Sequence, residues 1–426
     1  MIRLNKAVVI SIDSLFTRDI KYLEKLPNFK KILDGASIVK DINCIYPTLT
    51  YPCHTTIVTG VYPDKHNISH NEKLELNAKM PDWYWYSNDI KCDSIIDIAK
   101  KNNITTSTIL WPVTGRCNSD HNIAEIWTKN EGEDPIEVYT NSCSKHLMEK
   151  IYPKYSHIIN WNKEPYLDEF GVCCAEDIIK EYKPDLMLIH LAYLDHTRHQ
   201  YGLYHEKVIN SFKTYDKWLG RIINSLKEAS VYYKTNFIIL GDHGQLEVKK
   251  LISPNIVFKD KGLISIDKDG KITDYKAIFK SAGISSHVIV KDKTYIDKVK
   301  NILEAMKDDE TFGIESIFDR NELKNNHRLD CDADFVIEGK EGIAFSNDVT
   351  GEITKETDNS NYKYCLATHG HLPHKGDKPP FIAKGPNIKE NITINSGNLV
   401  DEAPTIMKIF DIDMKNIDGC AFNIVK

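Results

Sequence analysis

Short apolar segments that alternate with helix-like segments constrain this chain more than any other feature. The segment AVVISID, residues 7–13, is almost continuously apolar and ends in an acid, which is typical of a strand buried on both faces of a parallel sheet. Four later segments share this character: TSTILWP at 106–112, DLMLIHL at 185–191, NFIILGDHG at 236–244 and PPFIAKG at 379–385. Two segments between them, 94–104 and 215–229, place apolar residues at helical spacing. The alternation predicts an α/β fold with a mostly parallel central sheet and helices on both faces.

The pattern changes after about residue 250. Residues 263–275 read as a hairpin that turns at Asp269-Gly270, residues 287–306 as a strand followed by a helix, and residues 332–345 as two more short strands. Strands and helices are therefore no longer regularly alternating. We predict an inserted α+β subdomain at 251–359, within a core formed by 1–250 and 360–426.

Composition and charge argue against some kinds of binding partner and indicate where the protein is located. The chain of 426 residues has a formal net charge of −6, so no bulk basic field favours a nucleic-acid polymer or an anionic membrane. No run approaches the ~20 apolar residues that span a bilayer. The first residues lack the pattern of a signal peptide, and the ten cysteines include no CxxC pair. These features predict a cytoplasmic protein with reduced thiols, and they leave the oligomeric state open.

Acids and histidines follow the predicted strands. They are Asp13, Asp195, Asp242, His243 and His369, and His199 lies one helical turn after Asp195. In an open α/β sheet, ligands bind beyond the carboxyl ends of the strands, so these side chains are expected to converge there. A single strand-end acid is more often a helix cap than a ligand. Together, however, carboxylates and imidazoles form the ligand set of divalent metals such as zinc.

The segment YPTLTYPCHTT, residues 46–56, is rich in hydroxyl groups and is interrupted by two prolines. It reads either as a loop that caps a helix starting near Pro52 or as the site of a nucleophile. A metal ion lowers the pKa of bound water from ~16 to ~7. A comparable effect on threonine amounts to ~12 kcal/mol, enough to make Thr50 an alkoxide at neutral pH without a histidine base. A metal pair would thus explain how a plain threonine attacks phosphorus.

These motifs resemble the nucleotide pyrophosphatase/phosphodiesterase (type I phosphodiesterase) family of the alkaline phosphatase superfamily. PTLTYPCH matches the family segment P-T-x-T-[FY]-P-x-H, and TGVYPDKH matches TG-x-x-P-x-x-H. The resemblance covers the core at both ends of the chain and leaves out the insert. It implies an alkaline-phosphatase-like fold, two divalent metal ions with zinc favoured, and hydrolysis of phosphodiester or pyrophosphate bonds in nucleotide-like substrates.

The resemblance also implies roles for individual residues. Thr50 would be the nucleophile that forms a phosphoryl- or nucleotidyl-enzyme intermediate. Asn71, with Asn67 close by, would donate its amide to a phosphoryl oxygen. Tyr51 would stack on the leaving nucleoside, or else simply pack in the core. The implied metal ligands are Asp13, Thr50, Asp242 and His243 for one ion and Asp195, His199 and His369 for the other.

The chain departs from the family in some respects, and other readings stay open. Cys53 stands where the family often has asparagine, and GDHGQ replaces the commoner SDHGM. The alternatives are a phosphonoacetate-type phosphonate hydrolase, for which Lys129 is a candidate carboxylate-binding group, a phosphomonoesterase or mutase, and a non-catalytic metal-binding protein. We expect a diester to be preferred, because the residues around Thr50 are uncharged, unless Arg198 or a lysine of the insert reaches the site.

Overall fold

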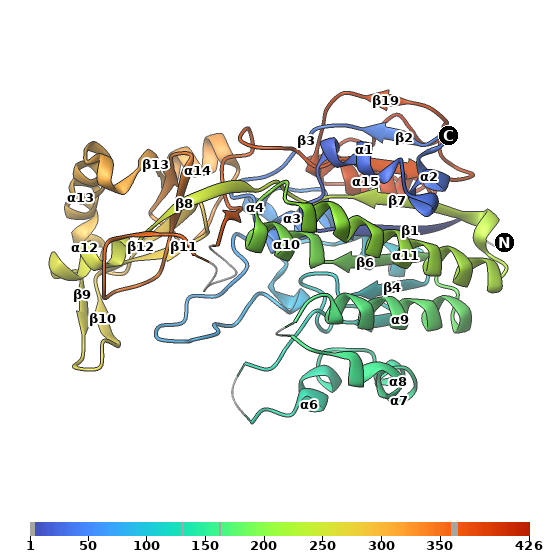
Figure 1. Ribbon diagram of the computed structural model, residues 1–426, viewed down its shortest axis with the longest axis horizontal. Coiled ribbons are helices and arrows are strands. Elements are labelled where there is room, and N and C mark those ends of the chain that lie inside the picture. The colour runs from blue at the N-terminus through green and yellow to red at the C-terminus, as the bar shows by residue number, and fades with distance from the viewer. Residues whose placement is uncertain (1–4, 130–131, 162, 359–364) are drawn as a thin grey trace.

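The computed structural model describes residues 5–129, 132–161, 163–358 and 365–426. An eight-stranded sheet in the order β19-β2-β18-β7-β1-β6-β4-β5 forms the centre of the molecule (Figure 1). Its strands are β1 (Lys6–Ile12), β2 (Ser37–Val39), β4 (Thr106–Ile109), β5 (His121–Ile123), β6 (Leu186–Leu191), β7 (Thr235–Leu240), β18 (Phe381–Lys384) and β19 (Thr393–Ile394). The strand β1 pairs in parallel with β6 and β7. The five segments expected as core strands all contribute to this sheet.

One core strand runs against its neighbours. The segment 379–385 forms β18, which pairs antiparallel with both β7 and β2. Its apolar residues are buried like those of the parallel strands, and a burial pattern carries no information on strand direction. The sheet is therefore mostly, but not entirely, parallel.

Helices cover both faces of the central sheet, because each strand buries alternate side chains on opposite sides. Val8 and Ile10 of β1 belong to one apolar cluster, and Ala7 and Val9 belong to another. The first cluster is closed by α2 (Pro27–Leu33), α9 (Tyr166–Glu181), α10 (Tyr193–Tyr201) and α11 (Glu206–Glu228). The second is closed by α3 (Thr50–Thr59), α5 (Ile95–Lys101) and α15 (Glu402–Lys408). The expected α/β class with helices on both faces is confirmed.

A second group of sheets lies at the left of Figure 1. One sheet has the order β11-β12-β14-β13, another joins β8 to β15, β16 and β17, and β9 with β10 forms the expected hairpin around Asp269 and Gly270. The strands are β8 (Leu246–Ile252), β9 (Ile264–Ile266), β10 (Ile272–Tyr275), β11 (Ala277–Ser281), β12 (Ser285–Val290), β13 (Ile314–Asp319), β14 (Phe335–Gly339), β15 (Gly342–Phe345), β16 (Thr354–Glu356) and β17 (Ala367–Thr368). The helices are α12 (Pro254–Asp260), α13 (Ile296–Asp308) and α14 (Arg320–His327).

The expected limits of the insert can be placed on these elements. β8 spans Leu246–Ile252 and so crosses the expected limit between residues 250 and 251. The other expected limit, between residues 359 and 360, lies outside the described residues. The division into 1–250 with 360–426 and 251–359 stays a prediction.

The remaining α-helices and strands of the described residues are short. They are α1 (Ile20–Leu23), α4 (Pro63–His66), α6 (Pro135–Thr140), α7 (Lys145–Lys150), α8 (Tyr152–Tyr155), β3 (Ile42–Asn43) and β20 (Gly397–Asn398).

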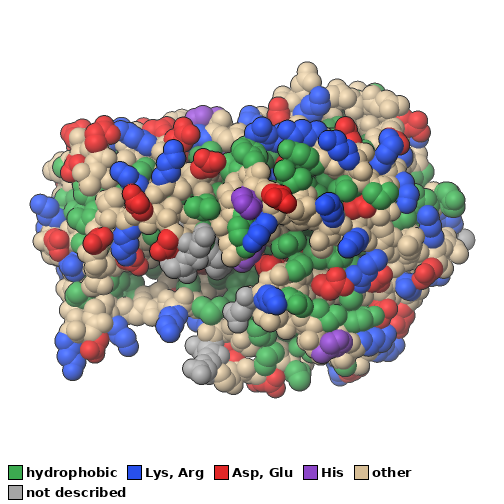
Figure 2. Space-filling model, viewed as in Figure 1, with side chains coloured by type: hydrophobic (Ala, Val, Ile, Leu, Met, Phe, Trp, Pro, Cys, Tyr) green, Lys and Arg blue, Asp and Glu red, His purple; other side chains and the backbone are tan. Residues whose placement is uncertain are grey.

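Basic and acidic side chains are interspersed on the face shown in Figure 2, with apolar side chains scattered between them. No large field of a single sign covers this face, which agrees with the small negative net charge of −6. Within the described part of the chain, none of the helices has the length and apolarity needed to cross a bilayer.

Candidate active site

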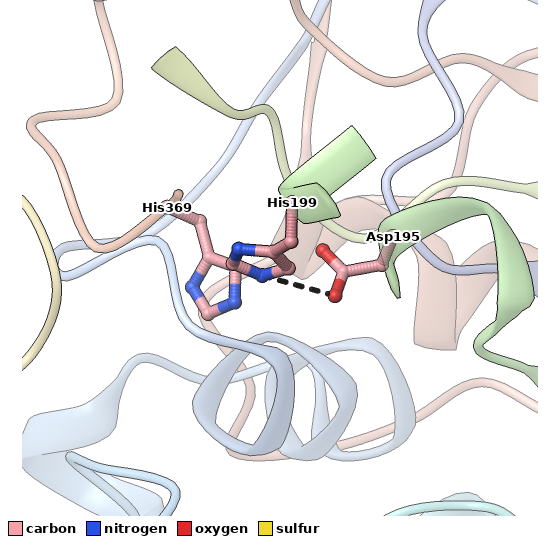
Figure 3. A group of neighbouring side chains, drawn as sticks. All are labelled: Asp195, His199 and His369. Carbon is pink, nitrogen blue, oxygen red and sulfur yellow. Dashed lines mark ion pairs between the residues drawn. The ribbon is translucent and has the colours of Figure 1, made fainter. Parts of the chain in front are cut away.

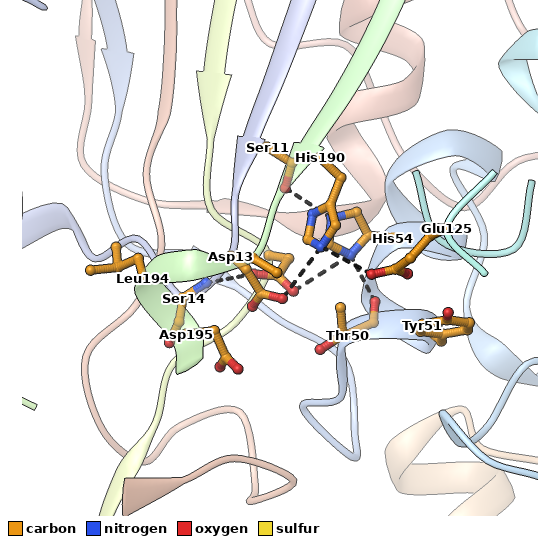
Figure 4. A network of polar contacts seen from close by, with 12 residues as sticks. Ser11, Asp13, Ser14, Thr50, Tyr51, His54, Glu125, His190, Leu194 and Asp195 are labelled. Carbon is orange, nitrogen blue, oxygen red and sulfur yellow. Dashed lines mark hydrogen bonds and ion pairs between the residues drawn. The ribbon is translucent and has the colours of Figure 1, made fainter. Parts of the chain in front are cut away.

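The side chains expected at the strand ends meet beyond the carboxyl edge of the central sheet. Asp13 directly follows β1, and Asp242 with His243 follows β7 after one intervening glycine. Asp195 lies in the first turn of α10, the helix that follows β6. Thr50 is the first residue of α3. Figure 4 shows Asp13, Thr50 and Asp195 close to one another, so the topology brings together residues that are far apart in the sequence.

One group of potential metal ligands consists of Asp195, His199 and His369 (Figure 3). The predicted helical spacing of Asp195 and His199 holds, since both lie on α10 and His199 Nε2 is 3.2 Å from Asp195 Oδ2. His199 Nδ1 lies 2.7 Å from the Ala367 carbonyl oxygen. A carbonyl only accepts, so Nδ1 carries the proton and Nε2 is the nitrogen that can coordinate a metal. In metal-ligating histidines, the ring nitrogen that does not bind the metal typically donates a hydrogen bond of this kind.

His243 is the centre of the second group. Its Nε2 lies 3.0 Å from Thr50 Oγ1, 3.1 Å from Asp242 Oδ2 and 3.4 Å from Asp13 Oδ1. Its Nδ1 donates to the Gly244 carbonyl oxygen at 3.2 Å, so the lone pair of Nε2 faces these oxygens. Burial lowers the pKa of His243 to about 4, which keeps the ring neutral at neutral pH. A neutral imidazole lone pair that faces carboxylate oxygens is the arrangement a cation between them would stabilise.

Asp195 joins the two groups. Ligand atoms of Asp13, Asp195 and His243 all lie within 4.8 Å of one another, as do those of Asp195, His199 and His369. From the sequence, Asp195 is expected only in the group with His199 and His369. Its placement between both groups makes one continuous centre, with the two sets of ligands side by side.

The polar atoms of this centre fit divalent cations. Among the described residues, Asp13 Oδ1, Asp242 Oδ2 and His369 Nδ1 are buried and accept or donate no hydrogen bond. Burial, and then the charge of Asp242, raises the pKa of Asp13 well above its ordinary value, and burial raises the pKa of Asp242 to about 6. Buried carboxylates are destabilised in this way unless a positive charge compensates them. The residues present therefore match the donor set of zinc or a similar ion.

The structure distinguishes Thr50 from its neighbouring threonines. Thr50 is 7% exposed and its hydroxyl faces His243. Thr48 Oγ1 donates instead to the His371 carbonyl oxygen at 3.0 Å, and Thr55 Oγ1 donates to the Tyr51 carbonyl oxygen at 2.8 Å. Among these three hydroxyl groups, that of Thr50 alone lies at the metal ligands. Its position at the start of α3 also places it at the positive end of the helix dipole.

Asn71 and Tyr51 lie next to the nucleophile candidate. The backbone N–H of Tyr51 donates to Asn71 Oδ1 at 2.9 Å, which orients the amide and leaves its NH₂ group as the donor that the predicted role requires. Tyr51 itself is fully buried, and its ring packs edge-on against Trp83 at a centroid distance of 5.0 Å. The structure thus favours the packing role of Tyr51 over stacking on a leaving group, because its ring offers no exposed face.

Two buried histidines and the half-buried Glu125, all behind the centre, were not singled out from the sequence. His54 Nδ1 donates to the Thr50 carbonyl oxygen at 2.8 Å and lies 3.5 Å from Asp242 Oδ2, and His190 Nε2 lies 3.5 Å from Asp13 Oδ2 (Figure 4). Glu125 Oε1 is 3.9 Å from the same His190 nitrogen, and burial raises the pKa of Glu125 to about 8. The sequence could have pointed to both histidines, because His54 ends the PTLTYPCH segment and His190 is a polar residue within an apolar strand. Glu125 follows β5, a strand that the sequence pattern did not reveal.

Comparison with known proteins gives a consistent result. A model of the family described as "Type I phosphodiesterase / nucleotide pyrophosphatase" matches residues 7–371. Human ectonucleotide pyrophosphatase/phosphodiesterase family member 1 is 27% identical over 243 residues, which are 54% of this chain and 22% of that protein. The venom phosphodiesterase of Naja atra is 24% identical over 402 residues, 88% of this chain and 41% of that protein. The chain thus spans less than half the length of these relatives.

The solved structures agree in fold. The structure of murine ectonucleotide pyrophosphatase/phosphodiesterase 5 aligns with a TM-score of 0.69 and 16% identity, over 99% of this chain and 100% of that one. The family match covers most of the chain and includes all seven expected metal ligands. This chain belongs to the type I phosphodiesterase/nucleotide pyrophosphatase family.

Proposed function

We propose that this chain is a metal-dependent hydrolase of phosphodiester or pyrophosphate bonds in nucleotide-like substrates, with Thr50 as its nucleophile. The observation that carries the proposal is the position of Thr50 Oγ1, 3.0 Å from His243 Nε2, at the edge of a cluster of buried carboxylates and imidazoles. The aspartates and histidines favour two divalent ions, with zinc as the ion that this donor set suits best. The ligands would be Asp13, Thr50, Asp242 and His243 for one ion and Asp195, His199 and His369 for the other, with Asp195 near both.

The residues of the chain suggest the following chemistry. When bound, divalent ions would supply the positive charge that lowers the pKa of a hydroxyl and neutralises the oxygens of the transferred group. Thr50 Oγ1 forms a bond to phosphorus as the bond to the leaving oxygen breaks. Water then attacks the same phosphorus and the bond to Thr50 breaks, which restores the hydroxyl. Asn71 donates its amide N–H to a phosphoryl oxygen and stabilises the charge that develops there.

The named relatives support this assignment. A further solved structure is of an inactive variant of the murine protein, carrying a threonine-to-alanine change, in complex with AMP. A threonine needed for activity and a bound nucleotide are what the proposal expects of this chain. We accordingly propose a small phosphoester or nucleotide substrate, and no nucleic-acid polymer or membrane as partner. A cytoplasmic location stays a prediction from the sequence.

The proposal predicts a preference for diesters. Arg198 does not supply an extra positive charge to the site, because it is fully buried and pairs with Asp19. A monoester carries about one more negative charge on the transferred group and needs further cations for stabilisation. Metal-loaded protein is therefore expected to hydrolyse bis(p-nitrophenyl) phosphate with a higher kcat/KM than p-nitrophenyl phosphate, measured on one preparation. A higher kcat/KM for the monoester would refute the diesterase assignment.

One observation favours a second candidate, a phosphomonoesterase or a phosphonoacetate-type hydrolase. The buried Lys280 of β11 donates its ammonium group to the carbonyl oxygen of Glu72, the neighbour of Asn71. Lys129, in contrast, is held by Glu75 at 2.6 Å and Asp82 at 3.1 Å. Under this second candidate, Lys280→Met would lower kcat/KM for the monoester much more than for the diester. Equal effects on both substrates would remove Lys280 as a charge-recognition residue.

A further inference from the structure

The loop that carries His369 is held between two parts of the molecule. We call residues 369–375 the histidine loop. On one side, the Ile284 N–H donates to the His369 carbonyl oxygen at 3.0 Å. On the other side, the Gly370 N–H donates to the Thr48 carbonyl oxygen at 2.8 Å, two residues before Thr50. The loop therefore connects the β11–β14 sheet to the segment of the nucleophile.

The contact on the side of the β11–β14 sheet is backbone against backbone. Gly370 has a φ of +87°, and a Cβ added there would lie 1.7 Å from the Ala282 carbonyl oxygen. Gly283 has a φ of +90°, and a Cβ there would lie 2.3 Å from the His369 carbonyl oxygen. Only glycine allows this approach at either position. The position of His369 thus depends directly on where this sheet places its turn at residues 282–283.

The carboxylate of Glu338, in β14, connects the β11–β14 sheet to both the histidine loop and the segment that leads to Thr50. Its side chain is fully buried. Oε1 accepts from the Leu372 N–H at 3.0 Å and from Lys375 Nζ at 2.9 Å, both in the histidine loop. Oε2 accepts from the Tyr46 hydroxyl at 3.1 Å, in the segment that leads to Thr50. No stability argument demands a charge here, since a buried ion pair is often replaceable by apolar residues without loss.

We propose that Glu338 is a positioning residue of the metal centre, whose carboxylate fixes the histidine loop so that His369 reaches Asp195 and His199. The inference rests on the metal-binding part of the proposed function. It assigns to the region of residues 251–359 a role in building the site. Lys375 also pairs with Glu315 at 2.6 Å, so loss of the Glu338 charge would not leave the ammonium group without a carboxylate.

Two substitutions of Glu338 separate the effect of side-chain length from the effect of its negative charge. Glu338→Asp keeps the charge but withdraws the carboxylate by one methylene, which breaks the bonds to Leu372 and Tyr46. Glu338→Gln keeps the reach, and its amide oxygen can still accept from the Leu372 N–H. The zinc affinity of the metal-free protein is measured by competition against a chelator. Glu338→Asp is expected to lower the affinity for one of the two zinc ions by about 10–100-fold, as loss of a residue that orients a metal ligand does. Glu338→Gln is expected to bind zinc like the wild type.

A matched control lies directly before the same strand, β14. Asp334 is also buried, accepts from the Val290 N–H at 2.8 Å and pairs with Lys293 at 2.6 Å, but it makes none of these bonds to the histidine loop. Asp334→Asn is expected to lower the Tm while leaving zinc affinity unchanged. Circular dichroism of each variant checks that the fold is retained.

A double-mutant cycle with His369→Ala tests whether Glu338 acts through His369. If it does, Glu338→Asp causes no further loss of zinc affinity in the His369→Ala background. The proposal is overturned if Glu338→Asp binds zinc like the wild type, if Glu338→Gln is weakened as well, or if the loss persists without His369. Wild-type protein that binds no zinc would instead overturn the proposed function itself, and this inference with it.

Discussion

Thr50→Ala is expected to lower kcat for a phosphodiester by about 10³-fold or more, as loss of a nucleophile does in enzymes that form a covalent intermediate. The methyl group that replaces the hydroxyl cannot attack phosphorus, and Thr50 Oγ1 is the hydroxyl that lies 3.0 Å from His243 Nε2. Thr50→Ser keeps a hydroxyl and should keep part of the activity. The measurement is steady-state hydrolysis of bis(p-nitrophenyl) phosphate by metal-loaded protein, with metal content determined on the same samples.

Thr55→Ala is the matched control for this experiment. Thr55 lies on the same helix and is also buried, but its hydroxyl donates to the Tyr51 carbonyl oxygen at 2.8 Å. We expect it to lose some stability and to keep its kcat. Undiminished activity in Thr50→Ala, with zinc bound as in the wild type, would place the nucleophile elsewhere.

Removal of metal is expected to abolish activity, and zinc is expected to restore it best, with manganese or cobalt as possible substitutes. The reason is electrostatic. Without a cation, burial holds the pKa of Asp13 well above its ordinary value and that of Asp242 at about 6, and no positive charge lowers the pKa of the Thr50 hydroxyl or neutralises the transferred group. Zinc should also raise the Tm, since a ligand at 1,000 times its Kd stabilises the folded state by about 4 kcal/mol.

The comparison requires dialysis against a strong chelator, followed by addition of each metal alone. Asp195→Asn serves as the matched variant, because Asp195 contacts both groups of ligands. It should bind zinc weakly and recover little activity at zinc concentrations that fully restore the wild type. Full turnover by protein shown by elemental analysis to contain no metal would contradict the metal-centred account.

Much of the site follows from local sequence patterns. Asp13 comes directly after an apolar strand and Asp242 after one intervening glycine, and the direction of the strands then places both at one edge of the sheet. The spacing of Asp195 and His199 already implied one helical face, and both lie on α10. These inferences need only the order of residues along a strand or helix, which the sequence states directly.

Other features depend on contacts between distant segments. β18 has the apolar pattern of its neighbours, yet its antiparallel direction is set by how the chain returns to the sheet. Tyr51 follows the nucleophile in sequence, but the packing of Trp83 buries its ring. The position of Asp195 between both ligand groups and the link from Glu338 to the histidine loop arise only when the chain folds. No local pattern encodes such contacts.

The stereochemical course at phosphorus tests the central claim most directly. A phosphorothioate diester of known configuration is hydrolysed by metal-loaded wild-type protein in water enriched in heavy oxygen, and the configuration of the product is determined. Attack by Thr50 followed by attack of water gives two in-line displacements, each of which inverts phosphorus. The account predicts overall retention of configuration. Overall inversion would mean that water attacks the substrate directly, and it would contradict a covalent intermediate on Thr50.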